Sequence, residues 1–392
     1  MNLDQAIDNC ISKAVENKII PGAVVAVVNQ DGLMSLRSHG VRSEANQDPM
    51  TGDTVFQIAS MTKPITGTAC MQAVERGLLA LDQPAAEIIP WLGEVQVLEG
   101  FAQTEPILRP PSQPITLRNL LTHTSGFTYE VWNSELATWK DCTGNPGTGS
   151  GKLDSLRQPL SFDPGTRWEY GIGIDWAGQL LEVVSDLSLA EWMHEEIFDP
   201  LAMTSTAYDC RPDMQDRRAA THVLNGDTWK ALVSSGEKRT VEFDSGGGGL
   251  FSTVTDYAKF MQMLLRGGEL AGRRLLSPQT VSLMSTNSMG DLRVSPVVSQ
   301  NQKVSSDFEF MPGTPKSWGL TFQINEENVH GGRQTGSLSW AGLCNTHFWI
   351  DPKAGLGALL MTQTLPFMIP RVATLLKQLE RAIYETVTSS GD

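Results

Sequence analysis

The sequence predicts an α/β (α+β) fold in which an antiparallel sheet is flanked by helices and carries an inserted, mostly helical segment. Runs typical of strands lie near both ends of the 392-residue chain, at residues 22–39 and 318–362. The middle of the chain, residues 96–240, instead combines helical patterns with stretches rich in Gly, Pro, Ser and Thr. The simplest arrangement is one α/β domain formed by residues 1–95 and 241–392, with the middle segment as an inserted helical domain.

The first part of the chain alternates between helix and strand patterns. Apolar residues recur on one face of a helix within residues 3–15. Two strand-like runs follow at 22–28 and 33–39, and the Asp31-Gly32 pair between them favours a hairpin turn. These elements predict one flanking helix and the first two strands of the sheet.

A Ser-x-x-Lys sequence stands where the next strand-like run, residues 55–59, meets a helix pattern. Lys63 follows Ser60 by one helical turn, so both side chains are expected on the same face of the helix. Pro64 fits the first turn, because the N–H groups there have no partner within the helix. A serine becomes a nucleophile when a base takes its proton, and a lysine can do so where its surroundings favour the neutral form.

The motif alone is weak evidence, because about one chance match is expected in a chain of this length. A second match, Ser235 to Lys238, lies in a polar loop without an apolar helix after it, and we interpret it as chance. The alternative for Ser60 is a helix N-cap followed by a solvated Lys63. The choice between these interpretations depends on the other residues of the site.

The remaining elements are predicted from the same patterns. Helices are expected at residues 116–121, 175–184, 189–198, 255–265, 277–284 and 372–384, and strands at 318–324, 335–340, 345–350 and 356–362. Irregular chain is expected from about residue 90, and a long ordered loop at 141–168. The glycines at 246–249 predict a tight passage of backbone, because a nucleotide loop would need Lys-Ser or Lys-Thr after them.

Composition and charge argue against several classes of function. The formal net charge of −14 disfavours nucleic acid and anionic membrane surfaces as partners. No apolar run approaches the length of a membrane span, and the N-terminal residues lack the pattern of a signal peptide. The five cysteines are scattered and odd in number, which is typical of buried thiols in a cytoplasmic protein. The six histidines form no spaced cluster, so we expect no metal and no cofactor, while the oligomeric state is left open.

Two further segments carry candidate partners for Ser60. Tyr170 lies between a turn-rich loop and a helix, where a phenol could accept or relay the serine proton; the alternative is a packing tyrosine. The strand that ends in Trp340-Ala341-Gly342 allows a ligand to lie against its backbone, because small residues leave the approach open. The backbone N–H of Leu343, together with that of Ser60, could then form an oxyanion hole. The alternative is a plain sheet strand whose Trp340 belongs to the core.

Other residues of the middle segment have less specific roles. Four aromatic residues either line an acyl pocket or pack in the core: Phe127, Tyr129, Trp132 and Trp139. We expect His123 to be a hydrogen-bonded loop histidine rather than a catalytic base, and Asp175 to cap or brace the helix that follows Tyr170.

Taken together, these motifs resemble the serine β-lactamase-like superfamily. Ser60-Met-Thr-Lys63, Tyr170 and Trp340-Ala-Gly342 occur in the order and rough spacing of that group, and further landmarks extend the resemblance over nearly the whole chain. The chain is most similar to family VIII carboxylesterases and to the related fungal acyltransferase that acylates a statin precursor. This resemblance implies a β-lactamase-like fold. The Gly-x-Ser-x-Gly sequence of ordinary α/β-hydrolases does not occur in the chain.

The sequence departs from the class C β-lactamases and penicillin-binding proteins at two motifs. Ile172 stands where they have the Asn of Tyr-x-Asn, and Trp340-Ala341-Gly342 replaces Lys-Thr-Gly. The missing lysine is the group expected to hold a β-lactam carboxylate. The tryptophan instead offers an apolar wall for a neutral ester, as in the Trp-Gly-Gly of family VIII esterases.

The resemblance implies that Lys63 and Tyr170 share the role of general base toward Ser60, that the N–H groups of Ser60 and Leu343 hold the oxyanion, and that Tyr170 protonates the leaving alcohol. The expected function is a serine carboxylesterase acting on short-chain acyl esters, with weak β-lactam hydrolysis as an open side activity. The expected partner is a small-molecule ester, with residues 340–342 binding it. The alternatives are an acyltransferase, a β-lactamase or D-amino-acid peptidase, and a non-catalytic ligand-binding sensor on the same fold.

Overall fold

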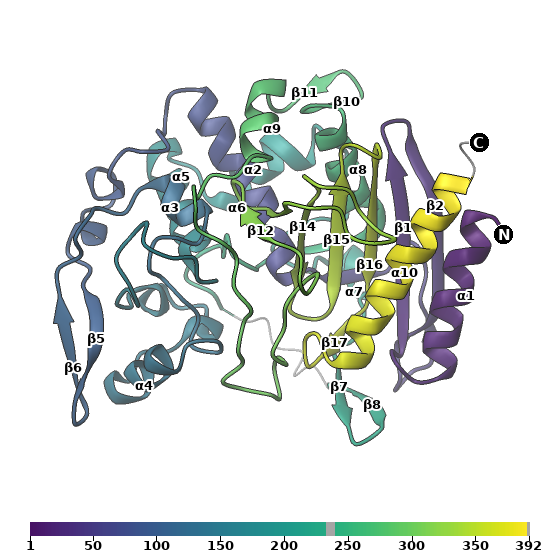
Figure 1. The fold of residues 1–392 in the computed structure, drawn as a ribbon, viewed down its shortest axis with the longest axis horizontal. Coiled ribbons are helices and arrows are strands. Elements are labelled where there is room, and N and C mark those ends of the chain that lie inside the picture. Colours follow the sequence, from purple (N-terminus) through teal and green to yellow (C-terminus); the bar gives the residue numbers. More distant parts are fainter. Residues whose placement is uncertain (233–239, 390–392) are drawn as a thin grey trace.

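The computed structural model of the chain describes residues 1–232 and 240–389 and is built around one antiparallel sheet of eight strands (Figure 1). The spatial order is β12-β13-β14-β15-β16-β1-β2-β3, so the strands from the end of the chain pair directly with those from its beginning. The strands are β1 (Gly22–Asn29), β2 (Gly32–Ser43), β3 (Asp48–Pro49), β12 (Lys316–Trp318), β13 (Gln323–Asn325), β14 (Leu338–Gly342), β15 (Thr346–Asp351) and β16 (Leu356–Met361). The second Ser-x-x-Lys match, Ser235 to Lys238, lies outside the described residues.

Helices cover both faces of the sheet (Figure 1). Alternate residues of β1 separate the two layers, with Val24 facing one apolar cluster and Val25 the other, as the period of two along a strand requires. Helices α1 (Leu3–Glu16) and α10 (Pro370–Ser389) pack side by side over one face. Helix α8 (Val254–Leu265) lies on the opposite face, whose apolar cluster also contains α2 (Thr62–Glu75).

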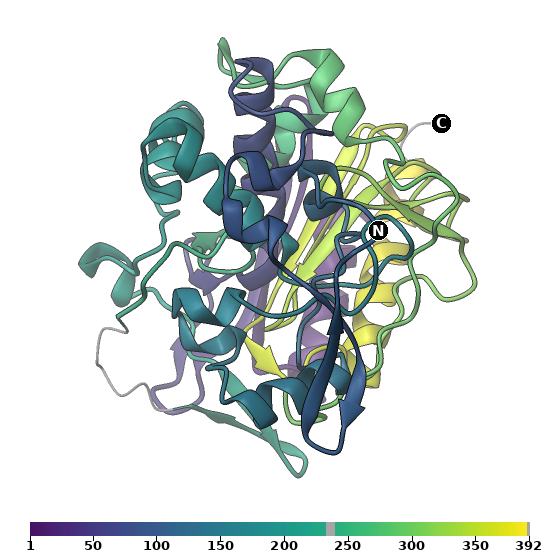
Figure 2. The same ribbon diagram turned by 90° about the vertical axis from the view of Figure 1, so that its left-hand side faces the viewer.

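Much of the segment between the two halves of the sheet lies at the end of the molecule that faces the viewer in Figure 2. Its helices are α3 (Leu117–Leu121), α4 (Ser134–Thr143), α5 (Gly173–Ser185), α6 (Leu189–Met193), the π-helical turn His194–Phe198 and α7 (Pro212–Gln215). Short 3-10 turns lie at Ala85–Glu87, Pro90–Gly93, Thr148–Ser150 and Leu153–Leu156. The division of the chain into two domains stays a prediction.

This segment also holds two hairpins that the sequence did not lead us to expect. They are formed by β5 (Val97–Ala102) with β6 (Glu105–Arg109), and by β7 (His222–Asn225) with β8 (Thr228–Ala231). Irregular chain was expected around the first hairpin because of its flanking prolines, but β6 carries only Pro106, and Pro110 follows its end. A two-stranded hairpin tolerates proline because one edge of each strand is unpaired.

The single strand expected at 318–324 is two short strands, β12 and β13, joined by a turn. Within the turn the Gly319 N–H donates to the Phe322 carbonyl at 2.8 Å, and Thr321 takes a left-handed backbone conformation with φ of 78°. A threonine gives no sequence signal for such a turn, because left-handed positions are usually filled by Gly or Asn. The remaining elements are β4 (Val55–Gln57) paired with β9 (Phe251–Thr253), β10 (Glu269–Leu270) with β11 (Arg273–Arg274), α9 (Pro278–Met284) and β17 (Thr364–Leu365).

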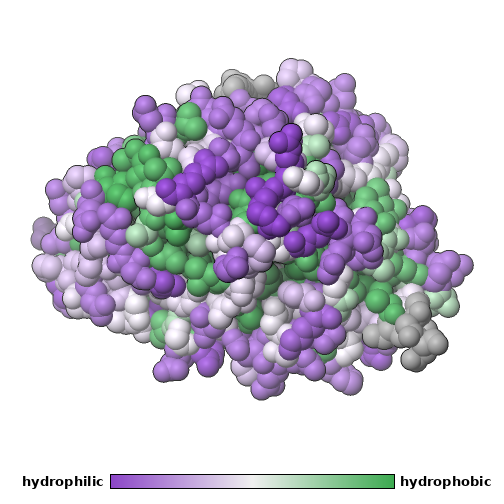
Figure 3. Space-filling view, turned by 90° about the horizontal axis from the view of Figure 1, so that it is seen from above, coloured by the Kyte–Doolittle hydropathy of each residue, from purple (hydrophilic) through white to green (hydrophobic). Residues whose placement is uncertain are grey.

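The surface is mainly hydrophilic when the molecule is seen from above, with hydrophobic residues in separate patches (Figure 3). Among the described residues, no helix is both long and apolar enough to cross a membrane. The cytoplasmic location expected from the sequence stays a prediction.

Candidate active site

Ser60 lies in a short 3-10 turn, Ala59–Met61, between strand β4 and helix α2. The turn is fixed from two sides, because the Ile58 N–H donates to the Leu250 carbonyl at 3.0 Å and the Tyr257 hydroxyl donates to the Met61 carbonyl at 2.9 Å. Ala59, directly before the serine, is in the left-handed region with φ of 44°. Such strain in a non-glycine residue persists only where the surroundings hold it, and it often marks a functional residue.

Lys63 is completely buried, so the alternative of a solvated lysine does not hold. Its Nζ donates to the Ser60 Oγ at 3.1 Å, to the Tyr129 hydroxyl at 3.0 Å and to the Gly247 carbonyl at 2.7 Å. These three acceptors match the three N–H bonds of an ammonium group. The helix that carries Lys63 is buried on nearly all sides, which explains why its sequence lacks a clear apolar face.

Tyr170 approaches Ser60 from the chain that leads into α5. Its hydroxyl donates to the Ser60 Oγ at 2.6 Å and receives a hydrogen bond from the Trp340 indole N–H at 3.2 Å. The Lys63 Nζ lies 4.7 Å from the centre of the Tyr170 ring. The structure therefore brings together the three side chains that were predicted from separate parts of the sequence to act in catalysis.

Tyr129 is a fourth member of this cluster that sequence reasoning did not assign. It was grouped with the aromatic residues of the middle segment, but its hydroxyl accepts a hydrogen bond from Lys63. Burial, reinforced by the neighbouring Tyr170, Asp175 and Glu130, raises the pKa of Tyr129 well above its ordinary value, so this phenol stays neutral at physiological pH. No spacing rule in the sequence links Tyr129 to Lys63, because they are 66 residues apart.

The end of strand β14 lies against the turn that carries Ser60. A side chain at Gly342 would place its Cβ 2.2 Å from the Ile58 carbonyl oxygen, so only glycine allows this approach. Leu343, whose N–H was expected in an oxyanion hole, directly follows this glycine, and Ala341 is buried beside it. The arrangement fits the oxyanion prediction, which stays a prediction.

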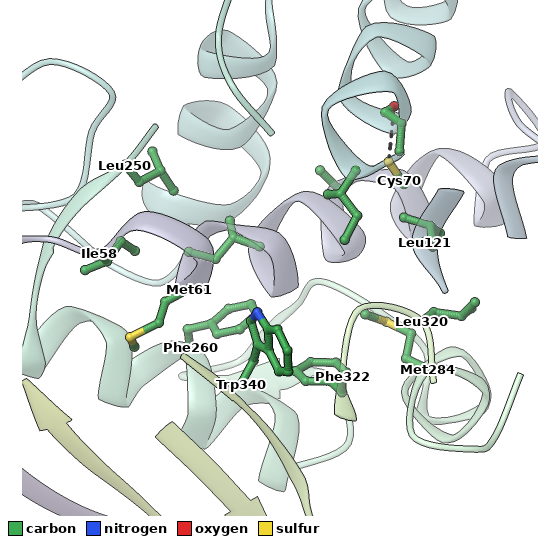
Figure 4. Packing of buried hydrophobic residues seen from close by; sticks show 14 of the residues in the cluster. Ile58, Met61, Cys70, Leu121, Leu250, Phe260, Met284, Leu320, Phe322 and Trp340 are labelled. Carbon is green, nitrogen blue, oxygen red and sulfur yellow. Dashed lines mark hydrogen bonds between the residues drawn. The ribbon is translucent and has the colours of Figure 1, made fainter. Parts of the chain in front are cut away.

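Trp340 is mostly a core residue in its packing. It is 4% exposed, and its ring centre lies 4.7 Å from that of Trp318, 4.8 Å from that of Tyr170 and 5.4 Å from that of Phe310. Figure 4 shows it within the buried apolar cluster below α2. Trp340 is therefore buried, as the alternative of a core tryptophan requires, and it also lies next to Tyr170, where an apolar wall of the site was predicted. Its indole N–H also donates a hydrogen bond to the Tyr170 hydroxyl, a polar contact that the sequence did not indicate.

The glycine-rich turn from Ser245 to Leu250 passes close to both Lys63 and α5. A Cβ at Gly247 would lie 2.4 Å from the Asp175 Oδ2, and one at Gly246 would lie 2.7 Å from the Ile174 carbonyl oxygen. These distances explain the glycines as a tight passage of backbone. Asp175 does not act only on its own helix, because its Oδ1 accepts hydrogen bonds from the Ser245 hydroxyl at 2.6 Å and the Gly247 N–H at 2.9 Å.

His123 is buried beside the site without touching Ser60. Its Nδ1 accepts a hydrogen bond from the Gly171 N–H at 3.3 Å, which ties down the chain just after Tyr170. Burial and the nearby charge of Lys63 lower the pKa of His123 well below its ordinary value, so the ring is neutral. Among the described residues, no group of three or more His, Cys, Asp or Glu side chains could hold a metal ion.

Comparison with known proteins gives matches over nearly the whole chain. A family model described as beta-lactamase matches residues 7–380. Monacolin J acid methylbutanoyltransferase of Aspergillus terreus is 35% identical over 397 residues, which cover 96% of this chain and 95% of the relative. Lovastatin esterase of Penicillium rubens is 33% identical over 375 residues, covering 90% and 92% of the two chains.

Solved structures confirm the predicted fold. A mutant of simvastatin synthase from Aspergillus terreus matches with a TM-score of 0.83 at 31% identity, covering 99% of this chain and 96% of that chain. EstCE1, described as a hydrolase with promiscuous acyltransferase activity, matches with a TM-score of 0.76 at 21% identity over 97% of this chain and 98% of that chain, which supports the fold alone.

Proposed function

The chain belongs to the beta-lactamase family and is a serine hydrolase or acyltransferase of that family, and from this premise we propose that it is a carboxylesterase that acts on short-chain acyl esters through an acyl-enzyme on Ser60. The observation that carries the proposal is the contact of Ser60 Oγ with two groups that can exchange protons with it, Tyr170 at 2.6 Å and Lys63 at 3.1 Å. A serine in such contact can lose its proton as it attacks.

In the proposed reaction, the pair formed by Tyr170 and Lys63 first gives up one proton to solvent, and Ser60 Oγ then attacks the ester carbonyl while its own proton passes to this pair. The backbone N–H groups of Ser60 and Leu343 hold the negative oxygen of the tetrahedral intermediate. Tyr170 then returns the proton to the leaving alcohol. Water attacks the acyl-enzyme by the same route in reverse, which releases the carboxylic acid and restores Ser60.

Acyl transfer to an alcohol is the second candidate. It is favoured by the 35% identity to Monacolin J acid methylbutanoyltransferase of Aspergillus terreus, since acyl transfer can proceed through the same kind of acyl-enzyme. The two reactions share their first half and differ in whether water or an alcohol takes the acyl group. Hydrolysis of β-lactams is less well supported, because Trp340 replaces the lysine expected to bind their carboxylate.

Release of p-nitrophenol from p-nitrophenyl butyrate tests the proposal. We expect rapid release by the wild type and, for Ser60→Ala, loss to the uncatalysed background, because the variant has no nucleophile. Ser235→Ala, in the second Ser-x-x-Lys match, is the matched control and should keep the wild-type rate. Equal release by wild type and Ser60→Ala would exclude Ser60 as the nucleophile. Added alcohol that diverts the acyl group into a new ester, detected by mass spectrometry, would favour the transferase.

A further inference from the structure

Asp175 is a buried carboxylate that is connected to Lys63 through one glycine. Its side chain is 4% exposed, and its Oδ1 accepts the Gly247 N–H at 2.9 Å. The carbonyl of the same glycine accepts a hydrogen bond from Lys63 Nζ at 2.7 Å. Gly247 therefore presents its N–H to the carboxylate and its carbonyl oxygen to the ammonium.

Two residues of α2 hold the turn that contains Gly247, one before and one after this glycine along the chain. Thr66, on the same helix as Lys63, donates its hydroxyl to the Gly246 carbonyl at 2.7 Å, and Thr62 accepts the Leu250 N–H at 3.2 Å. Between these two anchors, Asp175 is the group that fixes the central peptide. Without a carboxylate there, nothing else in the described contacts of Gly247 would orient its N–H.

No carboxylate is among the hydrogen-bond partners of Lys63 in the described part of the chain, whose acceptors are two hydroxyls and a carbonyl. A buried ammonium needs nearby negative charge, because burial alone favours the neutral form. The groups that face Lys63 are Tyr129 and His123 from the chain after α3 and Tyr170 and Asp175 at the start of α5. Tyr129 and His123 are neutral, so the Asp175 carboxylate is the group among these that can balance a charge on the amine.

We propose that Asp175 is a positioning residue for the Ser60 reaction: its carboxylate orients the Gly247 peptide and, across it, places a negative charge close to the Lys63 amine that contacts Ser60. The inference rests on the proposed function, since it assigns a role within the same site. Burial raises the pKa of Asp175 above its ordinary value, and the charge of Lys63 and the hydrogen bonds from Ser245 and Gly247 offset only part of this increase. Asp175 does not touch the substrate in this role.

The charge of Asp175 should be visible in the pH dependence of Ser60 reactivity. A nearby negative charge makes it harder to remove the proton that Lys63, Tyr170 and Ser60 share. Asp175→Asn keeps the shape but removes the charge, so the limb of the pH–rate profile that reports this proton should move to lower pH. One unit charge several ångströms away shifts such a limb by about one pH unit at an effective dielectric constant of about 20.

Two readouts on the intact protein test this expectation. The first is p-nitrophenyl butyrate hydrolysis as a function of pH. The second is the pH dependence of covalent labelling of Ser60 by a fluorophosphonate, in which the serine oxygen bonds to phosphorus, fluoride leaves and the serine proton passes to the cluster. Labelling measures Ser60 reactivity even where ester turnover is absent, so a failure of the proposed esterase function is distinguished from a failure of this inference.

Asp256→Asn is the matched control. Asp256 is 3% exposed and also accepts hydrogen bonds from a backbone N–H, that of Ser205 at 2.7 Å, and from a hydroxyl, that of Thr206 at 3.1 Å. The change therefore removes a buried carboxylate that accepts the same kinds of hydrogen bond and also pairs with Lys259 at 3.3 Å, but one that does not contact the turn next to Lys63. We expect it to leave both limbs of the profile unmoved.

A shift of the limb in Asp175→Asn, with none in Asp256→Asn, would support the proposal. A uniform loss of rate with unmoved limbs would overturn it and leave Asp175 a purely structural residue. Should Asp175→Asn fail to fold, Ser245→Ala replaces it: loss of this hydrogen bond leaves the negative charge of Asp175 less compensated, so the same acid limb should move to higher pH. An acid limb that stays at its wild-type position in Ser245→Ala would also overturn the proposal.

Discussion

Lys63 and Arg333 are both buried cations, but their charges are balanced in different ways. The Arg333 guanidinium, 5% exposed, contacts Glu380 directly through two parallel hydrogen bonds, Nε to Oε1 at 2.8 Å and Nη2 to Oε2 at 2.7 Å. Lys63 instead donates to hydroxyls and a carbonyl, and the carboxylate of Asp175 lies beyond the Gly247 peptide. Both cations are inaccessible to water, so the difference lies in the distance to the balancing charge.

Direct contact fixes the protonation of both partners. Burial acts against the charged form of Glu380, but the charge and hydrogen bonds of Arg333 outweigh it and hold the pKa of Glu380 below its ordinary value. The pair joins the chain before β14 to helix α10 and moves no proton. At Lys63 the carboxylate is not in contact, which in the proposed mechanism leaves the amine free to exchange protons with Ser60 and Tyr170.

The largest expected effect is on turnover, from Lys63→Met. This change removes the cation next to Ser60 but keeps a chain of similar length, so we expect ester hydrolysis to fall by about a thousandfold. The free energy of unfolding should change little, because relief of a buried charge offsets the loss of a donor to the Gly247 carbonyl. The rate of p-nitrophenol release measures turnover, and urea denaturation measures the free energy of unfolding. Near-wild-type turnover would remove Lys63 from the reaction.

The opposite pattern is expected for Glu380→Gln. Removal of one charge leaves Arg333 buried without its counter-charge, which should lower the free energy of unfolding by about 3 kcal/mol. Folded molecules should hydrolyse ester at the wild-type rate, because the pair is not part of the site. The double variant Arg333→Met, Glu380→Leu should recover most of the stability. A loss of activity per folded molecule would contradict the expectation that Arg333 contributes to stability and not to turnover.

A smaller effect is expected from His347, which lies near Arg333. Burial, with a contribution from Arg333, lowers the pKa of His347 to about 3, and neither ring nitrogen has a partner among the described residues. An unfolded histidine binds a proton below about pH 6.5, whereas the folded one stays neutral, so stability falls as the pH drops below that value.

The loss from His347 between about pH 6.5 and pH 5 amounts to about 2 kcal/mol for one such group. His347→Phe keeps a ring beside Phe367 and removes this titration, so its unfolding free energy should depend less steeply on pH. Denaturation curves at both pH values give the comparison. Identical pH dependence of the two proteins would assign the acid sensitivity to other groups, such as His123.

Sequence patterns predicted the parts of the site that are set by local rules. Ser60 and Lys63 are one helical turn apart, so the start of α2 was enough to place them on one face. Tyr170 and Trp340 were found through their motifs and the family resemblance, not through their contacts. The fold class followed from strand runs at both ends of the chain.

Contacts between segments far apart in the chain could not be predicted from spacing or motifs in the sequence. Tyr129 touches Lys63 because the chain between α3 and α4 passes beside α2, and Asp175 touches Gly247 because α5 and the glycine-rich turn both pack there. Asp175 was placed as a brace for its own helix, since a first-turn carboxylate is common there whatever else it binds. The hairpin of β5 and β6 was missed for a related reason, because proline content outweighed a short alternating pattern.

The order of strands has a consequence for the protein during its synthesis. Strand β1 pairs with β16, about 330 residues later, and the turn that carries Ser60 is packed against Gly342. While a ribosome is still translating the middle of the chain, the serine has been made but its neighbours in β14 have not. We expect no hydrolysis by a nascent chain until its last strands have emerged, so a prematurely terminated product would be inert rather than an unselective esterase.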